Sequence, residues 1–367
     1  MRLVCQSCHK QFPSSKPIWK CECGGLLTLE FHARFPLKKI QKRTHSLWRY
    51  REALPIENDT NIISFDEGFT PLIQEEFAGK KVFLKQDHLF PSGSFKDRGA
   101  TVLISKVHEL GITNVIEDSS GNAGAAIAAY CAKAKITCDV YVPEKTSPGK
   151  LTQIQRYRAH LHLIPGSRED TADAALKKAQ TTYYASHYRN PFFFHGTKTC
   201  IFEIVEQLDW SAPDTIILPV GNGTLLLGMY LGLQDLYKEK IIETIPKIIG
   251  VQSENCSPLA QAWKKHQQTK NFSTGKKTIA EGIAISNPVR AAEIISAIEE
   301  TNGDIITVSE QQIVDSLMKL GKKGYYVEPT SAVAFAGFLK HRMKQNKVTV
   351  VPLTGHGLKT NKTPITM

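Results

Sequence analysis

Short stretches of branched apolar residues alternate with longer helical patterns along most of this chain of 367 residues. The expected strands are 82–85, 114–117, 138–142, 161–164, 215–219, 248–252, 305–308 and 348–352. Helical patterns lie between them, at 123–132, 172–180, 197–208, 225–236, 289–299 and 331–340. Because parallel neighbours need a crossover between them, usually a helix, this alternation predicts parallel sheets with helices on both faces. The length suffices for two α/β domains, so we expect two doubly wound αβα domains.

The domain bounds that we expect follow from these patterns and from a cysteine-rich start. Residues 1–30 would form a small module, and residues 31–70, where the periodicity is weak, a wrapping arm. Residues 71–200 would form an amino-terminal αβα domain that includes a smaller mobile lobe, and residues 201–367 a carboxyl-terminal αβα domain.

Composition excludes several classes of protein. The chain is 41% hydrophobic and 22% charged, and no apolar run is long enough to span a membrane. Its start has no apolar signal segment, so we expect a cytoplasmic protein and not a secreted disulfide scaffold. The net charge is +11, and residues 1–60 hold eleven Lys and Arg against five Asp and Glu. This excess is typical of a solvated face, and binding of nucleic acid by this basic segment is the alternative.

Four of the eight cysteines crowd into the first 23 residues as two close pairs, Cys5 with Cys8 and Cys21 with Cys23. Four thiolates on either side of a short hairpin are typical of a structural zinc ribbon. The second pair is separated by one residue where two are usual, so thiols without metal in a reducing compartment are the alternative. A closed four-cysteine site would leave no position for catalysis.

Two expected strands run directly into turns that could hold anions. Gly221-Asn222-Gly223-Thr224 follows one strand and begins a helix, where free amide groups and the helix dipole favour a phosphate. The spacing of its glycines fits neither a dinucleotide fingerprint nor a P-loop. Ser119–Gly124 follows another strand, with two hydroxyls and an Asn122 amide that could hold a carboxylate. The ordinary alternatives are a tight connection and a capped helix.

A third junction places Lys96 at the start of a helical pattern over residues 96–110. The helix dipole and nearby Arg98 both disfavour a charged amine there, which favours a reactive neutral lysine. A lone lysine is usually a solvated surface group, but two anion cradles in the same chain favour the reactive interpretation.

The motifs Ser94–Gly99, Ser119–Gly124, Gly221–Thr224 and Leu353–Lys359 together resemble those of the threonine synthases. These are pyridoxal-phosphate-dependent lyases of the tryptophan-synthase β fold, fold type II. Further stretches agree in order, so the resemblance covers essentially the whole chain. It implies a cofactor between the two αβα domains, a homodimer, and the conversion of O-phosphohomoserine and water to threonine and phosphate.

The resemblance also implies a role for individual residues. Lys96 would carry pyridoxal phosphate covalently and act as the base. The turn of Gly221, Asn222, Gly223 and Thr224 would hold the phosphate of the cofactor. Asn122 would hydrogen-bond the 3′-oxygen of the cofactor, and Thr354 its pyridine nitrogen. Ser119 and Ser120 would bind the substrate carboxylate.

Three stretches depart from the threonine synthase pattern, and the first is residues 90–96, where the usual Asn-Pro-Thr reads Phe90-Pro91-Ser92. The segment that helps bind the substrate phosphate reads Gly166-Ser-Arg-Glu-Asp170, and Asp173 stands where an arginine is usual. Arg168 is the candidate to replace that cation. Residues 280–284 resemble those of serine/threonine dehydratases. A dehydratase or a cysteate-synthase-like β-replacement enzyme is therefore the main alternative, and a nucleic-acid-binding zinc-ribbon protein a remote one.

Overall fold

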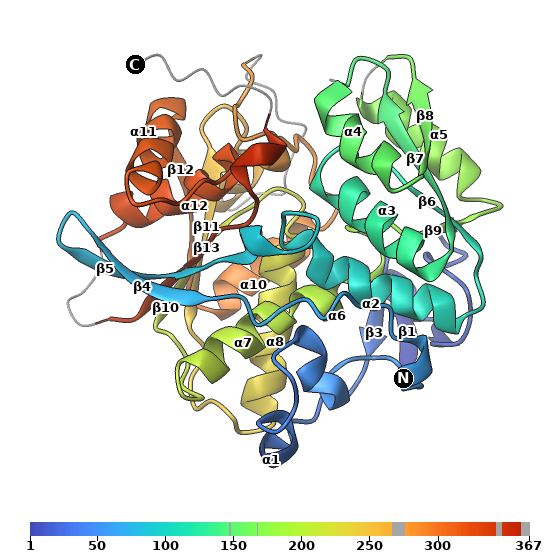
Figure 1. Ribbon diagram of the computed structural model, residues 1–367, viewed down its shortest axis with the longest axis horizontal. Coiled ribbons are helices and arrows are strands. Elements are labelled where there is room, and N and C mark those ends of the chain that lie inside the picture. Colours follow the sequence, from blue (N-terminus) through green and yellow to red (C-terminus); the bar gives the residue numbers. More distant parts are fainter. Residues whose placement is uncertain (147, 167, 266–275, 343–346, 361–367) are drawn as a thin grey trace. The chain divides into compact units, whose positions relative to one another are not determined.

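The computed structural model describes residues 1–360 except 147, 167, 266–275 and 343–346, and leaves out the side chains of 148–150, 168 and 169. The chain forms two compact units (Figure 1). The first comprises Met1–Gly68 and Lys96–Thr199, and the second comprises Phe69–Phe95 and Cys200–Met367. This division differs from the expected bounds because residues 69–95 join the second unit. In the described part of the chain, no helix is long and apolar enough to cross a membrane.

The first unit is built on a four-stranded parallel sheet with the order β8-β7-β6-β9. Its strands are β6 (Asn114–Glu117), β7 (Thr137–Pro143), β8 (His160–Ile164) and β9 (Tyr183–Tyr184). The connecting and flanking helices are α2 (Lys96–Glu109), α3 (Asn122–Ala134), α4 (Pro148–Arg156), α5 (Arg168–Lys178) and α6 (Pro191–Thr197). Right-handed crossovers put α3 and α4 on one face and α5 on the other, as expected for a doubly wound sheet. The alanine-rich α3 packs between β7 and α2.

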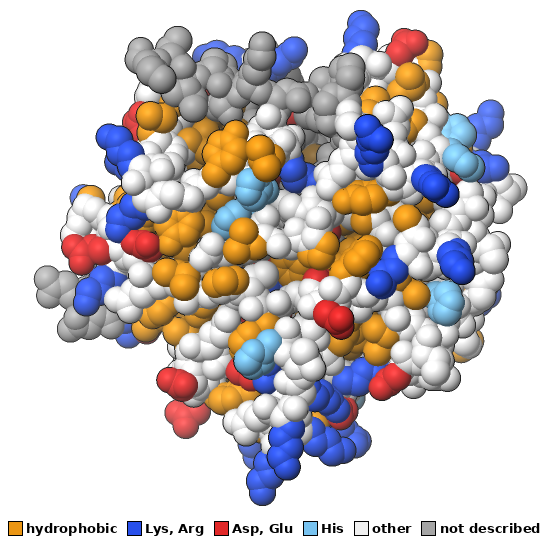
Figure 2. All heavy atoms as spheres, viewed as in Figure 1, with side chains coloured by type: hydrophobic (Ala, Val, Ile, Leu, Met, Phe, Trp, Pro, Cys, Tyr) orange, Lys and Arg blue, Asp and Glu red, His pale blue; other side chains and the backbone are white. Residues whose placement is uncertain are grey.

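Two smaller parts complete the first unit. A three-stranded antiparallel sheet in the order β2-β1-β3 consists of β1 (Arg2–Cys5), β2 (Gln11–Pro13) and β3 (Leu27–Glu30). The following segment holds only α1 (Leu37–Ile40) and the 3-10 turns η1 (Leu47–Ala53) and η2 (Asp59–Asn61). It is fastened to α2 by Trp48, whose indole N–H donates to Thr101 Oγ1 at 3.0 Å. Figure 2 shows lysine and arginine side chains gathered where Figure 1 draws α1, in the segment that contains Lys38, Lys39 and Lys42.

The second unit is built on a six-stranded sheet with the order β12-β11-β10-β13-β5-β4. Its strands are β4 (Leu72–Phe77), β5 (Lys80–Lys85), β10 (Thr215–Pro219), β11 (Lys247–Ser253), β12 (Asp304–Val308) and β13 (Thr349–Pro352). Five strands are parallel and β4 is antiparallel to β5, so the expectation of a wholly parallel sheet is wrong at this edge. A hairpin brings β4 back because Ala78 and Gly79, between the strands, both have positive φ, +51° and +74°.

Helices cover both faces of this second sheet. They are α7 (Thr199–Gln207), α8 (Thr224–Lys238), α9 (Pro258–Lys265), α10 (Ala291–Glu300), α11 (Glu310–Gly321) and α12 (Pro329–Lys340), with the turns η3 (Asp87–Leu89), η4 (Glu281–Ile283) and η5 (Gly357–Lys359). Crossover handedness puts α8 and α10 on one face and α11 and α12 on the other (Figure 1). Every residue of β13 and nearly all of α12 is buried, which explains the near-continuous apolar sequence of both.

Candidate active site

Lys96 is the first residue of α2, so the expected helix start is confirmed. Its Nζ lies 5.7 Å from the ring centroid of Phe193, and the lysine is half-buried. Phe193 can lie this close to α2 because position 99 is glycine. A Cβ on Gly99 would sit 2.3 Å from the Phe193 ring. The ring therefore supports the side of α2 from which the candidate reactive amine projects.

Arg98 lies two residues further along α2 and is fully buried. Its guanidinium donates a hydrogen bond to Thr199 Oγ1 at 3.0 Å. The helix α6 approaches closely here, since a Cβ on Gly196 would sit 2.0 Å from the Arg98 carbonyl oxygen. A fixed positive charge near the start of α2 is thus part of the surroundings of Lys96.

The predicted carboxylate-binding residues share one turn between β6 and α3. Ser119, Ser120 and Asn122 are half-buried there, and the Gly121 N–H donates to Ser119 Oγ at 3.3 Å. A Cβ on Gly124 would lie 1.8 Å from the Ser119 carbonyl oxygen, so only glycine at position 124 allows this backbone to approach the start of α3 so closely. The carboxyl end of β6 therefore presents two hydroxyls and the amides of a helix start at one place.

The glycine-rich turn Gly221–Thr224 leads from β10 into α8, as the sequence predicts. Gly223 has a φ of +75°, which favours glycine. A Cβ on Gly221 would lie 2.9 Å from Ile283 Cα, so this backbone passes directly under η4. A bare backbone turn at the start of a fifteen-residue helix is the kind of cradle that binds a phosphate.

Thr354 is fully buried and belongs to a backbone ladder that ends next to Lys96. The Phe95 N–H donates to the Thr354 carbonyl at 3.0 Å, and the His356 N–H donates to the Gly93 carbonyl at 2.9 Å. Lys96 is the residue after Phe95. Within the second unit, the loop after β13 is therefore paired with the stretch of chain that leads directly into the candidate reactive lysine.

Ser331 has no role that the sequence indicates, although residues 327–332 are part of the resemblance. The residue is fully buried in the first turn of α12, and its Oγ lies 3.0 Å from Thr354 Oγ1. Thr330 beside it accepts a hydrogen bond at 3.2 Å from the N–H of Gly282, in η4. These contacts connect the glycine-rich turn, η4, α12 and Thr354 in a single continuous set.

The residues of the second unit fit a polar, phosphate-bearing cofactor such as pyridoxal phosphate. The Ser94 hydroxyl, two residues before Lys96, is fully buried and has no hydrogen-bond partner among the described residues. Burying such a hydroxyl costs free energy unless something bonds to it. Together with a glycine cradle and the hydroxyl of Thr354, it supplies the donor set that a phosphorylated pyridine requires.

The expected contact to a distal substrate phosphate remains a prediction. Arg168 begins α5, but its side chain and all of residue 167 lie outside the described residues. Asp173, where the resemblance leads one to expect an arginine, is exposed on α5.

The four clustered cysteines lie together in the first unit, around the turns that follow β1 and precede β3. Their sulfur atoms are 3.5 Å apart for Cys5 with Cys23 and for Cys8 with Cys23, and 3.6 Å apart for Cys8 with Cys21. All four are free thiols. A tetrahedral zinc with bonds of about 2.3 Å needs sulfurs about 3.8 Å apart, which is close to this spacing. The Cys8 backbone amide lowers the pKa of the Cys5 thiol to about 6, whereas burial and the neighbouring thiols raise the pKa values of Cys21 and Cys23 in spite of their own backbone hydrogen bonds.

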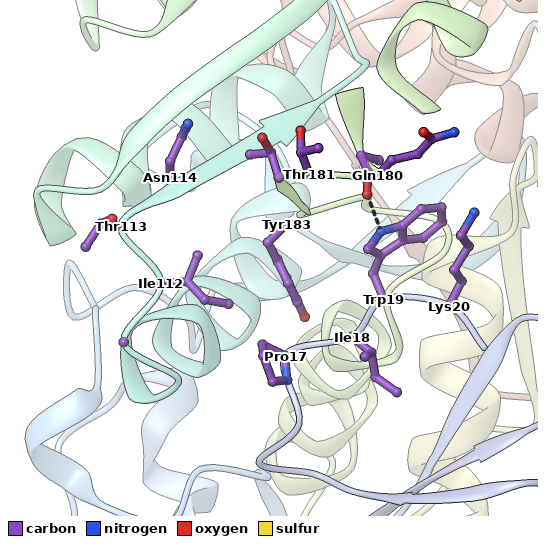
Figure 3. A pocket seen from close by; sticks show the side chains of 13 residues that line it. Pro17, Ile18, Trp19, Lys20, Ile112, Thr113, Asn114, Gln180, Thr181 and Tyr183 are labelled. Carbon is purple, nitrogen blue, oxygen red and sulfur yellow. Dashed lines mark hydrogen bonds between the residues drawn. The ribbon is translucent and has the colours of Figure 1, made fainter. Parts of the chain in front are cut away.

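A pocket of about 560 Å³ lies elsewhere in the first unit (Figure 3). It is lined by residues 17–20, 111–114 and 179–183, at the amino ends of β6 and β9. The Trp19 indole N–H donates to the Ala179 carbonyl at 3.2 Å across this pocket's edge. The pocket contains none of the predicted site residues, and Ser119, Ser120 and Asn122 follow the opposite, carboxyl end of β6.

Comparisons with known proteins identify the family of this chain. The family model described as pyridoxal-phosphate dependent enzyme matches residues 63–355. A threonine synthase of Methanocaldococcus jannaschii is 35% identical, with 97% of this chain and 92% of that protein covered. One of Methanosarcina acetivorans is 34% identical, with 99% and 93% covered.

Solved structures give the same fold. A crystal structure of a threonine deaminase from T.th. superposes with a TM-score of 0.69 over 81% of this chain and 94% of that one. At 24% sequence identity this similarity identifies the fold alone. With a family model across most of its length and relatives at this identity over nearly all of it, the chain belongs to the pyridoxal-phosphate-dependent enzymes and, among them, to the threonine synthase family.

Proposed function

We propose that this enzyme converts O-phosphohomoserine and water to threonine and phosphate. The observation that carries the proposal is the ladder that pairs Thr354 with the residues directly before Lys96. It pairs the backbone of buried Thr354 with Phe95, the residue directly before Lys96, in a chain whose relatives are threonine synthases.

The cofactor would be held by groups of three kinds. Lys96 would bind its aldehyde carbon covalently, and the amides of the turn Gly221, Asn222, Gly223 and Thr224 would hold its phosphate. Asn122 would bond to the 3′-oxygen, and Thr354 to the pyridine nitrogen. Pyridoxal phosphate, when bound, supplies the electron sink that stabilises negative charge on substrate carbons.

The reaction then depends on proton movements by this chain's own residues. Ser119, Ser120 and the amides of their turn would hold the substrate carboxylate. Lys96, released when the substrate amine takes its place, would remove protons from Cα and then Cβ as phosphate leaves Cγ. It would return protons to the substrate carbons while water adds at Cβ. Closure of a smaller mobile lobe around Ser119–Asn122 would keep other water out until that step.

Other amino acids compete with O-phosphohomoserine as the candidate substrate. An aspartate at position 173 would add negative charge near the expected site of the substrate phosphate, and residues 280–284 resemble a dehydratase. Serine, threonine and O-phosphoserine are therefore the competing substrates. Arg168, at the start of α5, would be the cation that makes O-phosphohomoserine the better one.

The test is to supply O-phosphohomoserine to the pyridoxal-phosphate-loaded protein and to follow threonine and phosphate together. Equal release of both, lost in Lys96→Ala and kept in a variant of exposed Lys322, Lys322→Ala, supports the proposal. Arg168→Gln should raise the KM for O-phosphohomoserine more than it lowers kcat. Ammonia and an oxo acid from serine or threonine, without turnover of O-phosphohomoserine, would instead identify a dehydratase, and cysteate from O-phosphoserine and sulfite a β-replacement enzyme.

We also propose that Cys5, Cys8, Cys21 and Cys23 bind one structural zinc ion, on the sulfur spacing given above. We expect the native protein to contain about one zinc ion per chain. The zinc content should fall in Cys8→Ser but not in the control Cys256→Ser, because the sulfur of Cys256 lies outside the cluster. A chelator should lower the melting temperature of the native chain. An equal zinc content in both variants would contradict the assignment.

For the assembly we propose a cytoplasmic homodimer, based on the resemblance and on eight free thiols. Light scattering of the holoenzyme at several concentrations measures the oligomeric state. Salt-sensitive retention on DNA or RNA would instead favour the nucleic-acid-binding alternative.

A further inference from the structure

We propose that Ser331 is a positioning residue that fixes the direction in which the Thr354 hydroxyl points its proton, and so keeps the cofactor's pyridine nitrogen unprotonated. The inference rests on the proposed function only in assigning Thr354 to that nitrogen. Ser331 itself acts through Thr354 and is given no contact with cofactor or substrate.

The hydrogen bonds of Ser331 leave it a choice of two acceptors. Its Oγ accepts the Gly355 N–H at 2.9 Å. Its own proton can go to Thr354 Oγ1 at 3.0 Å or to the Gly355 carbonyl at 3.2 Å. Because a hydroxyl carries one proton, the choice decides which way the Thr354 proton points.

The two directions of the Ser331 proton decide whether Thr354 offers a ligand a hydrogen-bond donor or only an acceptor. If Ser331 donates to Thr354, the Thr354 proton is available to an unprotonated ring nitrogen. If Ser331 donates to the Gly355 carbonyl, Thr354 donates to Ser331 and offers a ligand only lone pairs, which suit a protonated nitrogen.

The surrounding contacts favour the first arrangement. The Gly355 carbonyl already accepts the Glu328 N–H at 2.9 Å, so it has little need of a second donor. The path from Ser331 to Thr354 is also the shorter of the two. Both hydroxyls are fully buried, where no bulk water can exchange partners with them.

Among the described residues, Glu328 brings a charged side chain close to this network. The Glu328 carboxylate lies beside Gly355, so close that a Cβ there would be 2.4 Å from Glu328 Oε1. A buried negative charge would pull the ring nitrogen toward the protonated form. Ser331 and Glu328 therefore act in opposite directions, and a test must separate them.

The chemical consequence concerns the strength of the electron sink. An unprotonated ring withdraws electrons less strongly, so proton removal at the substrate depends more on the placement of Lys96 than on the ring. Loss of the Ser331 hydroxyl frees Thr354 to rotate and accept. We expect this to raise the apparent pKa of the ring nitrogen by about one unit, the equivalent of one hydrogen bond.

The experiment loads the holoenzyme with pyridoxal phosphate labelled with nitrogen-15 in the ring, and follows its chemical shift against pH. The native enzyme should show the unprotonated signal, and Ser331→Ala a titration displaced toward protonation. Ser331→Cys keeps the side-chain size with a weaker hydrogen-bonding atom and should shift in the same direction, should the alanine variant not fold. The matched control is Ser316→Ala, another buried serine of the second unit, whose hydroxyl has no partner among the described residues.

The outcomes separate the two proposals. A Ser331→Ala or Ser331→Cys signal identical to the native one, or a displacement of the same size in Ser316→Ala, overturns the role of Ser331 alone. A native signal that is already protonated, and becomes unprotonated in Glu328→Gln, assigns control of the nitrogen to Glu328 and also overturns it. Threonine formation is measured on the same samples, so a failure of the proposed reaction is seen independently of the ring signal.

Discussion

The buried ion pair of Lys85 and Glu203 supports the strand that leads toward the candidate reactive lysine. Lys85 Nζ lies 2.6 Å from Glu203 Oε2, and both side chains are fully buried. The same ammonium donates to the Thr70 carbonyl at 2.6 Å and to Gln207 Oε1 at 2.8 Å. The Thr70 N–H donates to Glu203 Oε2 at 3.2 Å. Every donor of the ammonium is therefore used inside the second unit.

Removing one partner should cost far more than removing both. Lys85→Met removes the ammonium that pairs with the buried Glu203 carboxylate, and breaking one side of such a buried pair typically costs about 3–5 kcal/mol. Glu203→Leu leaves a buried ammonium and should cost a similar amount. The double variant removes both members of this ion pair, and the Thr70 carbonyl keeps the Gln207 amide at 2.9 Å. We expect that variant to lose only about 1–3 kcal/mol, because its chief cost is loss of the Glu203 acceptor of the Thr70 N–H.

Thermal unfolding followed by circular dichroism measures these differences. For a unit of this size a loss of about 4 kcal/mol lowers the melting temperature by about 8–16 °C. The control is Lys323→Met, which removes the partly exposed pair with Glu75 and should cost less than about 1 kcal/mol. The reasoning is refuted if the costs of the two single substitutions add in the double variant, or if Lys85→Met is as mild as the control.

Three further predictions concern single positions. Burial lowers the pKa of His88 to about 4, so its contribution to stability is complete above about pH 6.5 and is lost as the pH falls toward 4. We expect the free energy of unfolding to drop by about 2 kcal/mol between pH 7.5 and 5 in urea titrations, and less in His88→Asn. Gly124→Ala would force the Ser119 carbonyl away from a Cβ 1.8 Å distant, so the KM for the amino-acid substrate should rise at least about tenfold; an unchanged KM contradicts the role of that turn. Gly223→Ala, at a φ of +75°, should weaken pyridoxal phosphate binding by about tenfold in equilibrium dialysis, with unchanged affinity as the contrary result.

The sequence pattern predicts the parallel part of the fold well. All eight expected strands are present, and Asn114–Glu117 and Thr215–Pro219 have the expected bounds. Buried parallel strands must be apolar throughout, so they stand out from their surroundings. The edge strand Leu72–Phe77 was missed because it is half polar, with exposed Gln and Glu side chains. Its signal in the sequence is Gly79, because glycine suits the positive φ that a two-residue hairpin turn needs.

The candidate site could be predicted only as far as it consists of local turns. The glycine-rich turn and the start of α2 have the expected bounds because helix starts have local signals. The pairing of residues 93–95 with residues 354–356 joins parts of the chain more than 250 positions apart, and no local pattern reports it. Ser331 was missed for the same reason, since its importance comes from its distance to Thr354 and not from its own neighbours in sequence.

The fluorescence of Trp19 can report on the state of the amino-terminal module of this enzyme. The buried indole of Trp19 lies two residues before Cys21, donates to Ala179 and packs edge-on against Tyr184 with ring centroids 5.1 Å apart. Indole emission depends on just such a hydrogen bond and on the polarity around the ring. Any event that loosens the cysteine cluster should therefore shift the emission spectrum, and Trp19→Phe should abolish that shift. The state of the amino-terminal module can thus be read by fluorescence in a working enzyme, without a label.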